Sequence, residues 1–161
     1  MNKLSSWIET LEKVMAMILI AAMTIIIAVA VVFRYFLNAP IYWANEASIF
    51  IMAWITFIGG SLGLKYKSQA SVTFLVDRLS EKGRKYLEIV SYVIILAFIA
   101  ILLYLSYEWL ITVLNQKSST MRIPMWIPYA SVPVGLSFAF IHLLTHLVNL
   151  FKPKEQGGQT T

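Results

Sequence analysis

Four long stretches without a charged side chain alternate with short polar segments along the chain. The uncharged stretches are residues 14–33, 47–64, 89–107 and 123–151. About 20 apolar residues in a helix are enough to cross a hydrocarbon core roughly 30 Å thick. The pattern therefore predicts an all-α integral membrane protein with four transmembrane helices, which span approximately residues 14–36, 46–64, 87–110 and 126–151.

Two of the polar segments carry an apolar stripe at helical spacing. The stripe in residues 1–13 consists of Leu4, Trp7, Ile8 and Leu11. The stripe in residues 70–85 consists of Val72, Leu75, Val76 and Leu79. The first predicts an amphipathic lead-in at the membrane interface, and the second predicts an amphipathic interfacial helix between the second and third spans. A plain solvated loop is the alternative for the second. Residues 152–161 have the composition of a disordered tail.

Lysine and arginine are distributed unevenly between the polar segments. Ten of the 13 lie in the two tails and in the segment between the second and third spans, and the other three are Arg34, Lys117 and Arg122. Short loops rich in lysine and arginine stay in the cytoplasm. The sequence thus predicts an N-in/C-in topology, with the first and third connections on the outer side.

The composition excludes several classes of protein. The chain is 59% hydrophobic and 13% charged, with a mean hydropathy of +0.74, which is too apolar for a soluble domain of this size. It has no cysteine, so disulfides, thiol redox chemistry and thiolate metal sites are excluded. No basic run is interleaved with aromatic residues, so the expected partner is the lipid bilayer and not a nucleic acid.

The apolar stretches offer little for chemistry. Asp, Glu, Lys and Arg are missing from all four, and such residues usually mark ion or substrate paths in membranes. We therefore expect that the chain does not move charged solutes alone, although an autonomous homo-oligomeric small transporter remains an alternative. His142 and His146 are spaced for one helix face, but the sequence supplies no further histidine and no cysteine as a metal ligand. They extend a face of small residues that includes Ser131, Gly135 and Ala139, which favours helix packing over a haem-bearing anchor subunit of a respiratory complex.

The first outer connection and the helix after it hold most of the informative polar and small residues. Arg34 and Glu46 flank this connection, and either suits an ordinary helix end or a polar patch that meets a partner. Trp43 suits the membrane interface in both cases. Gly59 and Gly63 form a GxxxG motif, which allows close packing either within this chain or against another subunit.

Three motifs in this region resemble the small membrane subunit of TRAP (tripartite ATP-independent periplasmic) transporters. The motifs are V-x-F-R-Y, P-I-Y-W-x-x-E and W-x-x-F-x-G-G-x-x-G, within residues 31–63. The residues that fall where the family's pattern places them are Arg34, Trp43, Glu46, Trp54 and Gly59. The resemblance covers roughly residues 14–150, although Gln69 and Thr73 stand where family members often have His and Asp, and Asn45 precedes Glu46.

The resemblance implies a supporting role in secondary active transport. It implies a non-enzymatic scaffold subunit of the bacterial inner membrane that packs on a large, elevator-type subunit. That large subunit would hold the sodium and substrate sites, so no cofactor is expected in this chain. A periplasmic binding protein would deliver an organic acid of the sialic acid or C4-dicarboxylate type. The residues we expect at partner interfaces are Arg34, Trp43, Glu46, Trp54, Gly59, Gly63 and Arg122.

Overall fold

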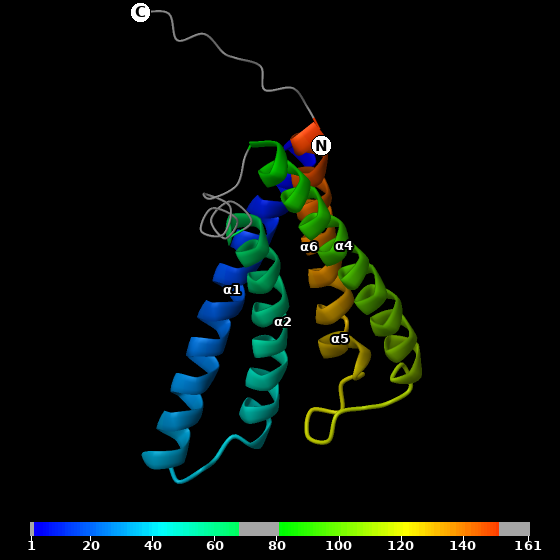
Figure 1. Ribbon diagram of the computed structural model, residues 1–161. Helices are drawn as coiled ribbons and strands as arrows, with labels where there is room; N and C mark the ends of the chain where they lie inside the picture. Colours follow the sequence, from blue (N-terminus) through cyan, green and yellow to red (C-terminus); the bar gives the residue numbers. More distant parts are fainter. Residues whose placement is uncertain (1, 68–80, 152–161) are drawn as a thin grey trace, which may run out of the picture.

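The computed structural model describes residues 2–67 and 81–151. Within them it contains four long helices and one helical turn (Figure 1). The elements are α1 (Asn2–Tyr35), α2 (Tyr42–Lys67), α4 (Glu81–Thr112), α5 (Trp126–Tyr129) and α6 (Ser131–Phe151). All four long helices are long and apolar enough to cross a membrane. The predicted all-α architecture with four spanning helices is confirmed to that extent.

The helices run alternately up and down, so the bundle has two distinct ends. We call the end where α1 begins and α6 ends the termini end, and the end with residues 36–41 and 113–125 the loop end (Figure 1). Even-numbered antiparallel spans place both termini on one side, as the structure does. That this side is cytoplasmic stays a prediction of the charge distribution.

Two predicted segments fall wholly or partly outside the described residues. Most of the expected interfacial helix lies there, including Val72, Leu75, Val76 and Leu79, and so does the tail 152–161. Residues 81–85, which we assigned to the interfacial helix, belong to the start of α4.

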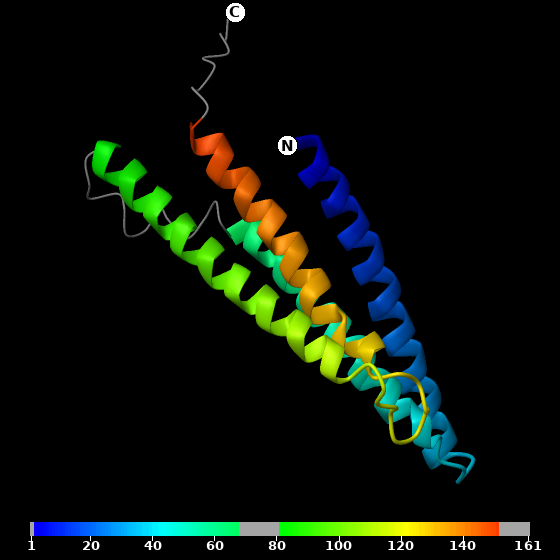
Figure 2. The same cartoon turned by 90° about the vertical axis from the view of Figure 1, so that its right-hand side faces the viewer.

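Helix α6 occupies the centre of the arrangement. It packs against α2 on one side and α4 on another, and α1 packs mainly on α2; Figure 2 shows α6 running between α4 and α1. Tyr92, Leu96 and Ile99 of α4 form a buried cluster with Ala139 and Leu143 of α6. The small-residue face of α6 is therefore a packing face, as its spacing predicts.

Helices α6 and α2 approach closely at Gly135. A Cβ atom added there would lie 2.7 Å from the Cβ and the carbonyl oxygen of Phe57 in α2. Only a glycine lets the two backbones meet at this distance, which is the role that small residues play between membrane helices.

Helix α1 is the least enclosed of the four. In its most apolar 18-residue stretch no residue is buried, against 39% of the corresponding stretch of α6. An apolar helix can only leave that much surface uncovered in lipid or against another protein. The described chain thus leaves an apolar face of α1 uncovered along its spanning length.

Candidate functional site

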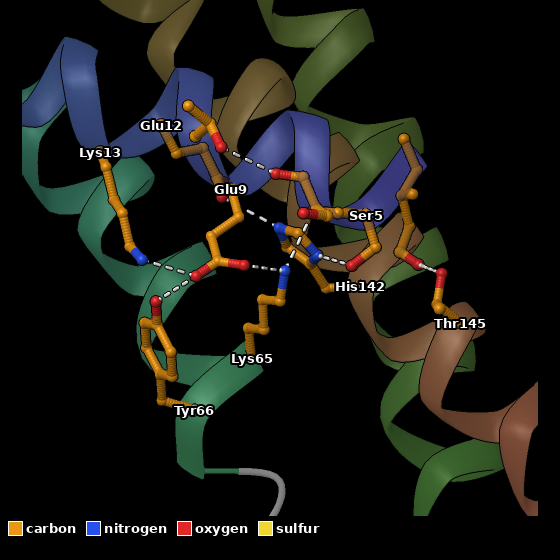
Figure 3. A network of polar contacts seen from close by, with 11 residues as sticks. Ser5, Glu9, Glu12, Lys13, Lys65, Tyr66, His142 and Thr145 are labelled. Atoms are coloured by element: carbon orange, nitrogen blue, oxygen red, sulfur yellow. Dashed lines mark hydrogen bonds and ion pairs between the residues drawn. The ribbon is translucent and has the colours of Figure 1, made fainter. Parts of the chain in front are cut away.

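At the termini end, a buried hydrogen-bonded chain joins α1 to α6. Nδ1 of His142 lies 2.8 Å from Oγ of Ser5, and Nε2 lies 2.9 Å from Oε2 of Glu12 (Figure 3). Ser5 and Glu12 are seven residues apart, so two helical turns bring them to the same face of α1. The side chains of Glu12 and His142 are both 0% exposed. This face of α1 is therefore attached to α6 through buried polar groups.

A second set of polar contacts attaches the same part of α1 to the end of α2. Glu9 accepts hydrogen bonds from Lys13 at 2.6 Å and from Lys65 at 2.7 Å, and also from the Tyr66 hydroxyl (Figure 3). Lys65 additionally donates to the carbonyl oxygen of Ser5 at 3.0 Å. Together with the His142 contacts, these bonds tie the first turns of α1 to both neighbouring helices.

Ser5, His142 and Glu12 have the residue types of a hydrolytic triad, but here they join two helices. Ser5 is buried and both ring nitrogens of His142 are hydrogen-bonded, so neither a substrate nor a metal ion has access to them. His146 stacks on Tyr92 with ring centroids 6.4 Å apart. In the described part of the chain, no group of three His, Asp or Glu side chains is placed to hold a metal. The histidines thus give no support to a haem-bearing anchor.

At the loop end, Glu46 holds the connection between α4 and α5. Glu46 lies just after the first turn of α2, and its carboxylate accepts backbone N–H bonds from Ser119 at 3.1 Å, Thr120 at 3.1 Å and Met121 at 2.8 Å. This connection is a short hairpin, closed by the bond from Ser118 N–H to the Ile123 carbonyl at 2.9 Å. Three donors converging on one carboxylate fix the hairpin against the start of α2.

The other predicted interface residues are spread over both ends and mostly uncovered. Arg34 is exposed in the last turn of α1, and Arg122 is exposed in the hairpin with a positive φ of 56°. Trp43 lies beside the hairpin, where it lines a shallow cavity with Thr120. Trp54 is half-buried on α2. Of the predicted interface residues outside the hairpin, the structure thus places only Trp43 and Glu46 next to it.

The GxxxG motif lies on an open face of α2. A Cβ atom added at Gly59, Gly60 or Gly63 would meet no described atom within 4 Å. Of the two interpretations of the motif, close packing within this chain is therefore not what the described residues show. The close packing within the chain is at Gly135 instead.

The sequence model of the family described as "Tripartite ATP-independent periplasmic transporters, DctQ component" matches residues 23–152. The chain belongs to this family. The predicted resemblance to small TRAP subunits is confirmed, and the DctQ family is a component of transporters and not of enzymes.

Individual members of the DctQ family are similar in sequence to most of this chain. The C4-dicarboxylate TRAP transporter small permease protein DctQ of Vibrio cholerae is 24% identical, with 91% of this chain and 75% of the relative covered. The sialic acid TRAP transporter small permease protein SiaQ of the same species is 27% identical, with 90% and 84% covered. The isethionate TRAP transporter permease protein DctMQ of Oleidesulfovibrio alaskensis is 28% identical over 68% of this chain, which corresponds to 18% of DctMQ.

The polar cluster at the start of this DctQ-family chain was not foreseen from the sequence. In the predicted lead-in stripe, Leu4 and Trp7 are 54% and 67% exposed and Ile8 is buried, and the polar residues Ser5 and Glu12, which the stripe does not include, are buried as well. The lead-in is also continuous with the first span in one helix, α1. A serine and a glutamate two turns apart on the same face, with a histidine in a later span, was the available signal.

Proposed function

We propose that this DctQ-family chain is the scaffold subunit of a sodium-coupled TRAP transporter. In this proposal it packs on the large elevator-type subunit, which holds the sodium and substrate sites. The imported solute is an organic acid of the sialic acid or C4-dicarboxylate type, because relatives named for both are similar to this chain. The termini face the cytoplasm, and a periplasmic binding protein approaches the loop end.

The observation that carries this proposal is where the charged groups lie. The four apolar stretches contain no Asp, Glu, Lys or Arg. Glu12 and Glu46, which flank the first and second stretches, are engaged in holding α1 to α6 and in holding the hairpin. An organic anion crossing the membrane needs cationic or strongly hydrogen-bonding groups along its path. This chain has no charged side chain within its four apolar stretches, so an autonomous transporter is disfavoured.

Two uncovered surfaces support packing on a larger membrane subunit. One is the bare apolar length of α1, and the other is the open face of α2 at Gly59 and Gly63. Glycines on a helix face allow a neighbouring helix to approach closely, and the gain comes from van der Waals contact. The relative named DctMQ, in which the matched region is 18% of a longer permease protein, is consistent with such an association.

On the outer side, we propose the hairpin and its surroundings as the contact for the binding protein. Arg122 is exposed there and Trp43 lies beside it, while Glu46 acts indirectly by holding the hairpin in place. Charge reversal at Arg122 should weaken binding-protein-dependent uptake and leave assembly of the membrane complex unchanged. Unchanged uptake in this variant would refute the role of the hairpin.

Co-purification tests the scaffold role. The full chain, expressed with its large TRAP subunit and extracted in mild detergent, should elute with that subunit as one complex. Gly59→Trp should weaken the complex, because the indole would occupy the space a partner helix needs. Ile94→Trp, at an exposed position of α4 outside both proposed surfaces, is the matched control for adding an indole elsewhere. Separate elution of the unmodified chain would refute the proposal.

A further inference from the structure

A cavity of about 670 Å³ lies between α1 and α2 at the loop end. Helix α1 leans away from α2 toward this end (Figure 1). The walls are mostly apolar and are contributed by Met23, Ile27, Ala30 and Val31 of α1 and Ile49 and Met52 of α2. The volume falls within the range of about 300–1,000 Å³ that is typical of sites for small organic ligands.

The cavity has the length of one membrane leaflet. Its wall along α1 runs from Met23 to Tyr35, and twelve steps of 1.5 Å cover about 18 Å. That is close to half of a hydrocarbon core about 30 Å thick. Toward the termini end α1 and α2 are held together by the bonds of Glu9 with Lys65 and Tyr66. A partner's transmembrane helix would need a groove through both leaflets, whereas an acyl chain ends where this cavity ends.

A cation stands at the mouth of the cavity, at headgroup depth. Arg34 lines the cavity in the last turn of α1 and is exposed. Within residues 2–67 and 81–151, its guanidinium makes no ion pair or hydrogen bond. The nearby carboxylate of Glu46 is already occupied by three backbone amides. A planar guanidinium that is left free at this depth is suited to a phosphate group, with which it can form two parallel hydrogen bonds.

We propose that the α1–α2 cavity binds one anionic glycerophospholipid from the leaflet at the loop end. One acyl chain lies against the apolar walls between Met23 and Val31, and the phosphate lies on Arg34. Asn45 and Tyr42, which also line the mouth, are placed to contact the rest of the headgroup. The lipid fills the space that opens as α1 leaves α2, and so it holds the outer half of α1 in position. Binding of this lipid is a property of α1 and α2 and does not depend on what the transporter carries.

Photolabelling of the detergent-purified full chain, in complex with its large subunit, tests the proposal. The probe is a phosphatidylglycerol with a diazirine on one acyl chain, and a phosphatidylcholine with the same chains is the comparison. Labelled peptides should come from residues 23–31 and 44–52, with phosphatidylglycerol preferred about fivefold, which corresponds to the gain of one basic side chain near an anionic headgroup. Inorganic phosphate at millimolar concentration should not compete, because the acyl chain supplies most of the binding.

Three variants separate the site from general lipid contact. Arg34→Gln should remove the preference for phosphatidylglycerol, and Ala30→Phe should lower labelling by both lipids because its ring fills the cavity. Arg122→Gln removes an exposed arginine at the same end that does not line the cavity, and it should leave labelling and preference unchanged. A preference that survives Arg34→Gln, or labelling spread evenly over the bare faces of α1 and α4, overturns the proposal. So does a cross-link that places a helix of the large subunit in the cavity.

Discussion

Replacing His142 by leucine tests whether the buried chain from Ser5 to Glu12 holds α1 in place. Leucine has a similar volume, so little cavity is created, but Oε2 of Glu12 loses its partner while Oε1 already has none among the described residues. If only two interhelical hydrogen bonds were lost, the cost would be about 1 kcal/mol, since such bonds between membrane helices average about 0.6 kcal/mol. Leaving a buried carboxyl group without any partner costs more, up to about 3 kcal/mol. Because both side chains are 0% exposed, we expect the larger value.

The assay is the equilibrium unfolding of the full chain in mixed micelles, titrated with dodecyl sulfate and followed by far-ultraviolet circular dichroism. Thr145→Val is the matched control, one turn away on the same helix, because its hydroxyl bonds only to the Ile141 carbonyl of its own helix. This control should cost about 1 kcal/mol or less. The double variant Glu12→Leu/His142→Leu should recover most of the loss, since replacing both partners of a buried hydrogen bond by apolar side chains is close to neutral. Equal costs for His142→Leu and Thr145→Val, or no recovery in the double variant, would refute this reasoning.

Further predictions concern the other contacts of the bundle. Glu46→Ala should speed hydrogen exchange of the three hairpin amides that donate to this carboxylate, as measured by mass spectrometry, with no change at the termini end. Unchanged exchange would show that the hairpin keeps its structure without Glu46. Gly135→Ala should destabilise the chain by about 1–3 kcal/mol, because the new methyl group overlaps the α2 backbone. Gly59→Ala meets no such contact and should gain up to about 1 kcal/mol of helix stability; similar effects of the two alanines in the same unfolding assay would contradict the packing described. Lys65→Met should lower the free energy of unfolding by about 1 kcal/mol or less, because its pair with Glu9 is partly exposed. A loss as large as that of His142→Leu would mean that α1 is attached mainly to α2 and not to α6.

The spanning helices could be predicted from the sequence because their signal is local. A run of about 20 apolar residues specifies a membrane helix whatever surrounds it, and the packing face of α6 follows from the spacing of Ser131, Gly135 and Ala139. Which helices pack against each other could not be predicted in this way, because it depends on contacts between residues far apart in the sequence. Glu12 and His142 are 130 residues apart, and the available signal, a serine and a glutamate two turns apart and a histidine in a later span, does not specify which residues pair.

The polar residues at the helix ends show the same limit. Arg34 and Glu46 flank one connection, and sequence spacing allowed them to pair or to face a partner. In the structure Glu46 turns to the backbone of a different connection, more than 70 residues away, and Arg34 faces a cavity. The two glycine positions were likewise indistinguishable by pattern, because only the neighbouring helix decides whether a missing Cβ is filled, as at Gly135, or open, as at Gly59.

Solute uptake into proteoliposomes tests most directly the claim that this chain supports transport without carrying a path of its own. Liposomes with the large subunit and this chain, supplied with the binding protein and an inward sodium gradient, should accumulate one organic acid from a labelled panel of sialic acids and C4-dicarboxylates. Liposomes with this chain alone should accumulate none, and those with the large subunit alone should show reduced uptake. Sodium-dependent uptake by this chain alone, or full uptake in its absence, would contradict the account.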